Sequence, residues 1–296
     1  MSEKRNKLSA FLLLFVSFIL LFSACDLDSE VPDDDSSVFD NPLVIAFLDV
    51  DQGDCGLISC NGKNILIDCG EAEYSSRVIE FLDENNIQKL DCFILSHPHS
   101  DHMGAAQRIV GAVDCETIVL PEFSEFSMPV SNLYYDFLDS LESLDCNVIS
   151  VNDGDSFDCG DVRLDFFSPL FDSEDHNDMS IVLNATYSET SVLFTGDATV
   201  RTENAILEKD YDIETDILKV AHHGSYTSSS LEFLQKADAE IAVISCGLNN
   251  LYGHPHDEVV DRLKDLGAKI FRTDESGTIV CYGDGKTFEV ANYNDL

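Results

Sequence analysis

Three histidines and one aspartate fall within six positions of the stretch SHPHSDHMG, residues 96–104, in a chain that has only eight histidines. His97 and His99 follow the apolar run LDCFILS two residues apart, so an extended backbone would point both side chains the same way. Asp101 and His102 come directly afterwards. Imidazole nitrogen and carboxylate oxygen are ligands that zinc and similar ions accept, and four such groups could surround two neighbouring ions. The alternative is a loop of capping and surface polar residues.

Two later apolar segments also end in side chains of this kind. SVLFTGDAT ends in Asp197 after a glycine that allows a sharp turn, and DILKVAHHGS ends in His222 and His223. Because neighbouring strand residues face opposite ways, we expect only one of the two histidines to bind metal, while the other bonds to substrate or backbone. Taken alone, Asp197 could be a helix N-cap and the histidines could be structural. Together with the first cluster, these segments favour a metal centre.

A framework of strands and helices must position these side chains. Apolar runs and turn residues predict strands at 43–50, 55–60, 64–69, 90–96, 117–121, 147–151, 161–168, 179–187, 190–196, 216–221, 240–246, 269–273, 277–282 and 286–290. Helices are expected at 75–86, 103–111, 131–144, 228–236 and 256–266, and from about residue 199. Strand-rich segments with helices between them in both halves predict two sheets packed face to face, with helices outside.

The ten cysteines mostly lie inside apolar runs, where they are typical of small core residues. An Asn-Gly turn at 61–62 predicts a hairpin in which Cys60 lies opposite Lys63. In that register Cys55 and Cys69 are diagonal neighbours, and a disulfide between them remains open.

The N-terminus has the pattern of an export signal. A basic start and an apolar stretch end in LFSAC, which resembles a bacterial lipobox. We expect residues 1–24 to be a lipoprotein signal peptide, Cys25 to be lipidated, and residues 25–42 to be an acidic disordered tether. The hydrolase-like domain would then span 43–296, exported and anchored to the outer face of the bacterial membrane. An uncleaved anchor helix is the alternative.

The charge balance bears on possible substrates. The chain has 56 acidic and 17 basic residues, a formal net charge of −39. Such a surface repels polyanions, although salt screens the repulsion over about 8 Å at physiological ionic strength. This weighs against tight nucleic-acid binding by the protein surface.

The motifs SHPHSDHMG, VLFTGD and HHGS, in this order, resemble the metallo-beta-lactamase superfamily. LDVDQGDC, NDMSIVL, LKVAHHGS and YGHP with FRTDESGTI are similar to the beta-lactamase-like domain of ComEC-type DNA-uptake proteins, and the similarity runs from about residue 43 to 282. The resemblance implies an α+β fold, a four-layer αββα sandwich. It also implies two divalent metal ions, zinc or manganese, in a cleft at the sheet edges.

Carried over by position, the family's ligand set falls on the residues already singled out. His97 and His99 would bind the first ion, and Asp101 and His102 the second. Asp197 would bridge both ions. In the late pair, the resemblance favours His223 as a ligand and His222 as a substrate contact.

The sequence departs from the wider superfamily where a third histidine for the first ion is expected. The stretch HNDMS places Asn177 there, with His176 beside it. His176 could substitute as a ligand or be a loop histidine. Secondary candidates for substrate contact or support of the ligands are Asp54 in DQGD, Asp68 at a strand end, and His254 in YGHPH.

These features predict metal-assisted hydrolysis, in which a water between two ions loses a proton near neutral pH and attacks the substrate. Asp101 or Asp197 would orient that water. The resemblance favours a phosphodiester, with DNA or a smaller ester such as choline phosphate on a surface polymer as candidates. Beta-lactam hydrolysis is disfavoured because the narrower motifs differ from those of lactamases. The rival interpretation is a catalytically weak extracellular metal-binding or interaction lipoprotein; no protein partner can be inferred.

Overall fold

The computed structural model describes residues 41–296. The signal segment, Cys25 and all but the last two residues of the expected tether lie outside the described residues. Within 41–296, no helix has both the length and the hydropathy that crossing a bilayer would require.

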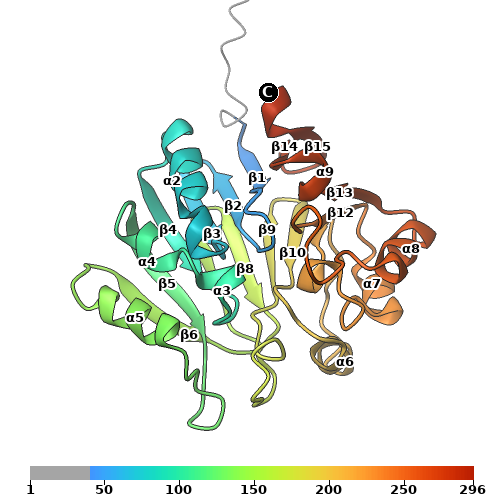
Figure 1. Ribbon diagram of the computed structural model, residues 1–296. Helices are drawn as coiled ribbons and strands as arrows, with labels where there is room; N and C mark the ends of the chain where they lie inside the picture. Colours follow the sequence, from blue (N-terminus) through green and yellow to red (C-terminus); the bar gives the residue numbers. More distant parts are fainter. Residues whose placement is uncertain (1–40) are drawn as a thin grey trace, which may run out of the picture. The chain divides into compact units, whose positions relative to one another are not determined.

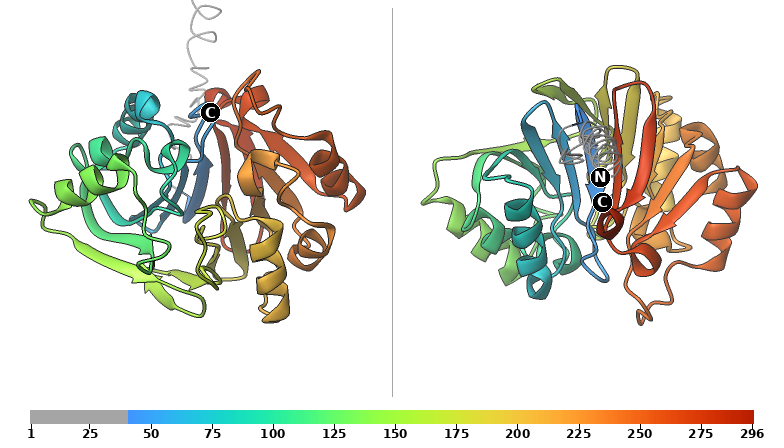
Figure 2. Two further views of the ribbon diagram at one scale, coloured as in Figure 1. Left: turned by 60° about the horizontal axis from the view of Figure 1, so that its bottom comes forward. Right: turned by 90° about the horizontal axis from the view of Figure 1, so that it is seen from above.

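Two mixed sheets form the centre of the domain, and each has helices on its outer face (Figures 1 and 2). The first sheet has the strand order β15-β14-β1-β2-β3-β4-β5-β6. Its strands are β1 (Leu43–Phe47), β2 (Gly56–Cys60), β3 (Lys63–Ile67), β4 (Lys89–Ile94), β5 (Asp114–Pro121), β6 (Asn147–Val151), β14 (Ile279–Gly283) and β15 (Phe288–Asn292).

The second sheet has the order β13-β12-β11-β10-β9-β8-β7. Its strands are β7 (Ser156–Cys159), β8 (Val162–Phe166), β9 (Leu183–Tyr187), β10 (Thr190–Phe194), β11 (Ile217–Lys219), β12 (Ile241–Ile244) and β13 (Lys269–Arg272). β10, β11, β12 and β13 run parallel, so their carboxyl ends meet at one edge.

The helices separate into two groups (Figure 1). The first sheet is covered by α2 (Ser75–Glu84), α4 (Ala106–Val110) and α5 (Asn132–Leu141), and the second by α6 (Val200–Glu208), α7 (Leu231–Ala237) and α8 (Asp257–Asp265). Short helices α3 (Ser100–Met103) and α9 (Thr273–Ser276) and the 3-10 turns η2 (Ala72–Tyr74), η3 (Ala221–Gly224) and η4 (Tyr293–Asp295) lie between strands and helices.

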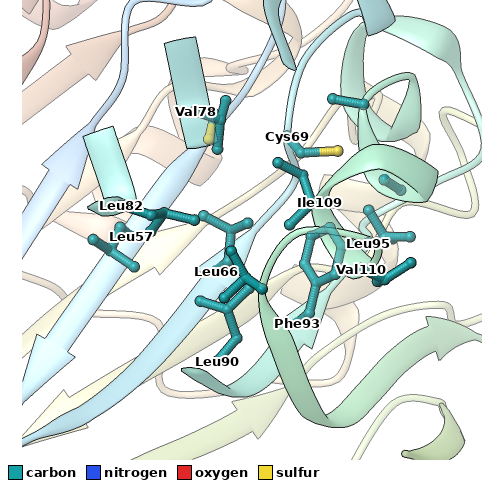
Figure 3. Packing of buried hydrophobic residues seen from close by; sticks show 14 of the residues in the cluster. Leu57, Leu66, Cys69, Val78, Leu82, Leu90, Phe93, Leu95, Ile109 and Val110 are labelled. Atoms are coloured by element: carbon teal, nitrogen blue, oxygen red, sulfur yellow. The ribbon is translucent and has the colours of Figure 1, made fainter. Parts of the chain in front are cut away.

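Three buried apolar layers account for this arrangement. Leu57, Leu66 and Phe93 point from the first sheet toward Ile109 and Val110 of α4 (Figure 3). A second layer lies between the sheets, and a third lies between the second sheet and its helices. Alternation along the strands sends every other side chain to each face, which is why each sheet buries both faces. The expected αββα sandwich is confirmed.

The element boundaries differ from the sequence prediction in a few places. β7 was not predicted, because its residues SFDC are a short, mostly polar edge strand. The helix after the histidine cluster begins earlier, at Ser100, and is interrupted between α3 and α4. The hairpin register with Cys60 opposite Lys63 is confirmed. The nine cysteines of the described region are all free, so Cys55 and Cys69 form no disulfide here.

Candidate metal centre

The three ligand-bearing segments meet at one place. His102 in α3 lies after β4, Asp197 lies after β10, and His223 lies after β11. His102 Nε2 is 3.1 Å from Asp197 Oδ1, and His223 Nε2 is 3.6 Å from the same oxygen. His223 Nε2 is also 3.3 Å from Asp101 Oδ2. Segments more than 120 residues apart in the chain therefore supply one cluster.

Asp197 is the shared member of the cluster. Its Oδ1 faces His102 and His223, whereas its Oδ2 lies 3.9 Å from His97 Nε2 and 3.5 Å from His222 Nε2. The preceding glycine makes this placement possible, because it has a φ of +47° and a Cβ there would lie 3.0 Å from Ser96 Oγ. The carboxylate thus presents one oxygen to each half of the site.

One half of the site fits a divalent cation directly. The ligand atoms of Asp101, His102, Asp197 and His223 lie within 4.8 Å of one another. His102 Nε2, Asp197 Oδ1 and His223 Nε2 are buried and make no hydrogen bond. Unpaired buried polar atoms are costly, so three of them facing one point indicate a ligand. Ligands about 2.1 Å from a tetrahedral ion lie roughly 3.4 Å apart, which matches the distances between these atoms.

The other half of the site holds His97 and His99. His97 Nε2 faces His99 Nδ1 at 3.0 Å, and His97 Nδ1 lies 3.0 Å from Ser96 Oγ. With Asp197 Oδ2 nearby, these nitrogens supply donors for another cation. His97 is fully buried and His99 is partly exposed, so this half opens toward solvent.

His176 and Asn177 lie where the wider superfamily has a third histidine for the first ion. His176 Nε2 lies 3.0 Å from the Ser127 carbonyl oxygen, and its ring centre is 6.1 Å from that of His99. A loop carbonyl therefore pairs with one of the two ring nitrogens of His176. The Asn177 amide oxygen is buried without a hydrogen-bond partner.

Buried groups behind the ligands fix the orientation of His102. Its Nδ1 donates to Asp68 Oδ2 at 2.7 Å, while Asp68 also accepts hydrogen bonds from the Ser96 amide and hydroxyl, each at 2.7 Å. Because Nδ1 carries the proton in this bond, Nε2 is left as the atom that faces the centre. Asp68 therefore lies where its expected supporting role requires.

A second set of buried groups holds His223. Its Nδ1 lies 3.0 Å from the Ser245 carbonyl oxygen and 3.2 Å from Asp54 Oδ1. Lys219 Nζ lies 2.7 Å from Asp54 Oδ2, and the lysine is only 3% exposed. Sequence reasoning missed Lys219, although a lysine inside the apolar run DILKVA was a usable signal. Asp54 thus lies behind the candidate ligand His223, beside its Nδ1.

The electrostatics divide the histidines into two kinds. Burial lowers the pKa of His97, His99 and His222, so these rings are neutral and able to bind metal. Burial also acts against a proton on His223, but Asp197 and Asp54 outweigh it and raise the pKa of His223 to about 10.

The acidic groups of the centre are held in the charged form. Burial alone would raise the pKa of Asp54, yet Lys219 and His223 lower it to about 2. The pKa of Asp101 is lowered as well, because His223 and His102 outweigh the effect of burial. Anionic carboxylates are donors that zinc and manganese accept. Burial acts against a proton on His102 too, but Asp197 and Asp68 raise the pKa of His102, so His102 and His223 would each release a proton when a cation binds.

The expectation that His222 and His223 lie on a strand is wrong. β11 ends at Lys219, and both histidines lie in a turn with φ of +52° and +55°. The alternation of strand side chains therefore does not apply, and both rings approach Asp197. His222 is the more exposed of the two, and its Nδ1 lies 3.3 Å from Thr227 Oγ1.

His254 lies on the rim of the centre. Its ring centre is 5.7 Å from that of His222 and 6.1 Å from that of His223. Tyr252, which is 67% exposed, stacks against His254 with 5.5 Å between ring centres. Burial, with His223 and His222 nearby, lowers the pKa of His254 to about 4. An aromatic surface thus borders the site.

Comparison with known proteins agrees with this geometry. The sequence profile of the metallo-beta-lactamase superfamily matches residues 48–248. ComE operon protein 3 of Bacillus subtilis is 30% identical over 254 residues, covering 79% of this chain and 32% of that protein. Competence protein ComA of Neisseria gonorrhoeae is 29% identical over 248 residues, covering 82% and 33%. The chain therefore spans about a third of the length of these relatives.

Solved structures support the fold. YhfI of Bacillus subtilis, a metallo-beta-lactamase fold protein, aligns with a TM-score of 0.56 at 16% identity, covering 82% of this chain and all of that one. CmlA, a diiron beta-hydroxylase from Streptomyces venezuelae, aligns with a TM-score of 0.56 at 16% identity, covering 78% and 53%. The matched profile includes the histidine cluster, Asp197 and the His222-His223 turn, and the chain belongs to the metallo-beta-lactamase superfamily.

Proposed function

We propose that this chain is a metal-dependent hydrolase that cleaves phosphodiester bonds. The observation that carries the proposal is the group of buried, unpaired ligand atoms on His102, Asp197 and His223. A divalent ion held there would supply Lewis-acid chemistry, which makes a bound water more acidic and stabilises developing negative charge. Zinc is the favoured metal, and manganese suits the same donors.

The residues of the centre divide the remaining tasks. Asp101 has 25% of its side chain exposed, against 3% for Asp197, so Asp101 is the carboxylate that can orient an attacking water at the cleft. His222 has 23% of its side chain exposed, which suits a hydrogen bond to a substrate oxygen. Asp197 lies beside histidines of both halves of the site and keeps the two halves in position.

The substrate class follows from two considerations. Similarity to competence proteins favours a phosphodiester, with DNA as one candidate. The net charge of −39 opposes a long polyanion, so we favour a short strand or a small phosphodiester such as a choline phosphate ester. The exposed ring of Tyr252 beside His254 offers a stacking surface for an organic group next to the reacting bond.

The location of this activity rests on the N-terminal sequence. The basic and apolar start and the LFSAC motif favour export and lipidation at Cys25. We therefore propose that the domain acts outside the cell, anchored to the membrane through its lipid.

A specific observation favours a second candidate, a metal-binding protein with weak turnover. Asn177 stands where the wider superfamily has a histidine for the first ion, and His176 is bonded to a loop carbonyl. The first ion would then be held weakly, and hydrolysis that depends on two ions would be slow.

Metal analysis and turnover separate the two candidates. The protein would be loaded with zinc or manganese, dialysed, and analysed for metal per chain, then assayed with bis-p-nitrophenyl phosphate and short single-stranded DNA across salt concentrations. Phosphodiester turnover that is lost in Asp101→Ala and kept in the exposed control Asp145→Ala supports the hydrolase. Stoichiometric metal without turnover of any ester favours the binding protein.

A further inference from the structure

A hollow lies at the opposite end of β10 from the metal centre. Asp197 lies three residues after the end of β10, whereas this hollow begins at Thr190 and Ser191, the first residues of β10. The five residues of β10 span roughly 16 Å of extended chain. The hollow has a volume of about 500 Å³ and adjoins another of about 580 Å³ that shares Glu189, Asp212 and Glu214 with it. We call the two together the acidic groove.

Within residues 41–296, most carboxylates that line the acidic groove have no cationic partner, although Asp165 pairs with Arg163 at 3.1 Å. Asp165, Glu189, Asp212 and Glu214 line its first part, and Asp216, Asp238 and Glu240 line its second part. No lysine or arginine of the described residues lines either part. Within residues 41–296 there is no ion pair to Glu189, Asp212 or Glu214. On a chain with a net charge of −39, such a concave surface concentrates cations.

A buried amide provides an independent observation. Asn184 of β9 lines the groove, is only 8% exposed, and has a side-chain oxygen without a hydrogen-bond partner. Buried amide oxygens are nearly always paired, because leaving one unpaired costs stability. The Asn184 oxygen is thus an acceptor whose donor the described residues do not supply.

The fold explains why this amide lies in a hollow. Asn184 is directly opposite Asp165 of β8 and Leu193 of β10, and directly opposed residues share one face of a sheet. Leu193 packs in the apolar layer under α6, α7 and α8, so this is the outer face of the second sheet. That layer takes residues from β10, β11 and β12 but none from β8 or β9. The helices therefore cover less of the outer face of β8 and β9, where only the flanking Phe167 and Val182 join that layer.

The spacing of the carboxylates favours an organic ligand over a metal ion. Among the described residues, three metal-ligating side chains approach within 4.8 Å of one another only around His102. No three carboxylates of the groove are therefore close enough to share one ion. Hollows of 500 and 580 Å³ are in the range that binds small organic molecules.

We propose that the acidic groove binds a flexible organic polycation with primary or secondary ammonium groups. One ammonium group donates an N–H to Asn184 Oδ1, and the others lie against Glu189, Asp212 and Glu214. This inference is independent of the hydrolase function, because the groove contains none of the residues of the metal centre.

The test is calorimetric titration of the full chain with spermidine at physiological salt. We expect one bound spermidine per chain, and a similar affinity whether or not the metal centre is loaded. Asn184→Leu removes the acceptor and should weaken binding about tenfold, since a hydrogen bond to a charged group is being lost. Glu214→Gln should weaken binding several-fold, whereas Glu142→Gln, at an exposed site after α5, should leave it unchanged.

Two comparison ligands distinguish the donor from charge alone. A fully N-methylated spermidine keeps its charges but has no N–H to donate, so it should bind at least tenfold more weakly. Equal binding of the methylated compound, or equal effects of Glu142→Gln and Glu214→Gln, would overturn the proposal in favour of diffuse attraction to an acidic surface. Magnesium that displaces spermidine stoichiometrically would overturn it in favour of a metal site. Thermal unfolding of each variant checks that it is folded.

Discussion

The buried ion pair of Lys219 and Asp54, beside the metal centre, should contribute strongly to the free energy of unfolding of the domain. The pair joins Lys219 Nζ to Asp54 Oδ2 at 2.7 Å, with 3% and 6% of the two side chains exposed. Lys219→Met keeps the apolar length of the side chain and removes the charge. Asp54 then loses the main positive charge that lowers its pKa, while burial continues to raise that pKa.

The size of the effect follows from the burial of the pair. Removing one partner of a buried ion pair costs about 3–5 kcal/mol. His223 lies 3.2 Å from the other oxygen of Asp54 and offsets part of the loss, so we expect about 3 kcal/mol. That is a large share of the roughly 5–15 kcal/mol that stabilises a domain. The double variant Lys219→Met with Asp54→Asn should recover much of this loss, because the uncompensated charge is gone.

Urea unfolding at pH 7 with a chelator present measures this directly. The matched control is Lys236→Met, because Lys236 pairs with Asp210 at 2.6 Å but the aspartate is 94% exposed. The control should lose less than about 1 kcal/mol. Equal stability changes in Lys219→Met and Lys236→Met, with no recovery in the double variant, would refute the role assigned to the buried pair.

Three further predictions concern other parts of the domain. Asp68→Asn weakens the bond that orients His102, so metal affinity measured by chelator competition should fall about 10–100-fold; unchanged affinity would contradict the supporting role. Asn177→His restores an imidazole at the first ion's expected position and should raise metal per chain toward two after dialysis, whereas no change would show that this position does not reach the ion. Asp91 keeps a lowered pKa because Lys63 and Lys89 outweigh its burial. Its contribution to stability is therefore present above the ordinary pKa near 3.9 and is lost as pH falls through the lower folded value. The gap in unfolding free energy between the parent and Asp91→Asn should be constant from pH 5 to 7 and shrink below pH 4; a gap that grows in acid would contradict the sign.

The candidate ligand cluster could be predicted because its information is local in the sequence. His97, His99, Asp101 and His102 lie within six positions, and each apolar strand before a ligand-bearing segment is visible as an apolar run. The αββα architecture also followed from the sequence, because strand and helix patterns recur in both halves. Placing Asp197 in the same cluster required only the assumption that the strand ends that carry candidate ligands meet.

Other features depend on contacts between distant segments and could not be read from the sequence. The turn that brings both His222 and His223 to Asp197 has positive φ at two non-glycine residues, which strand periodicity does not predict. The pairing of Lys219 with Asp54 joins residues 165 positions apart. Whether the Asn184 side-chain oxygen has a partner depends on how the helices cover its strand, and that arrangement is a tertiary property.

The most direct test of the metal centre is a crystal of the zinc-loaded protein with anomalous diffraction recorded at the zinc edge. The proposed metal centre requires an ion about 2.0–2.2 Å from His102 Nε2, Asp197 Oδ1 and His223 Nε2. An anomalous peak away from these three atoms, or none after loading with zinc or manganese, would contradict it.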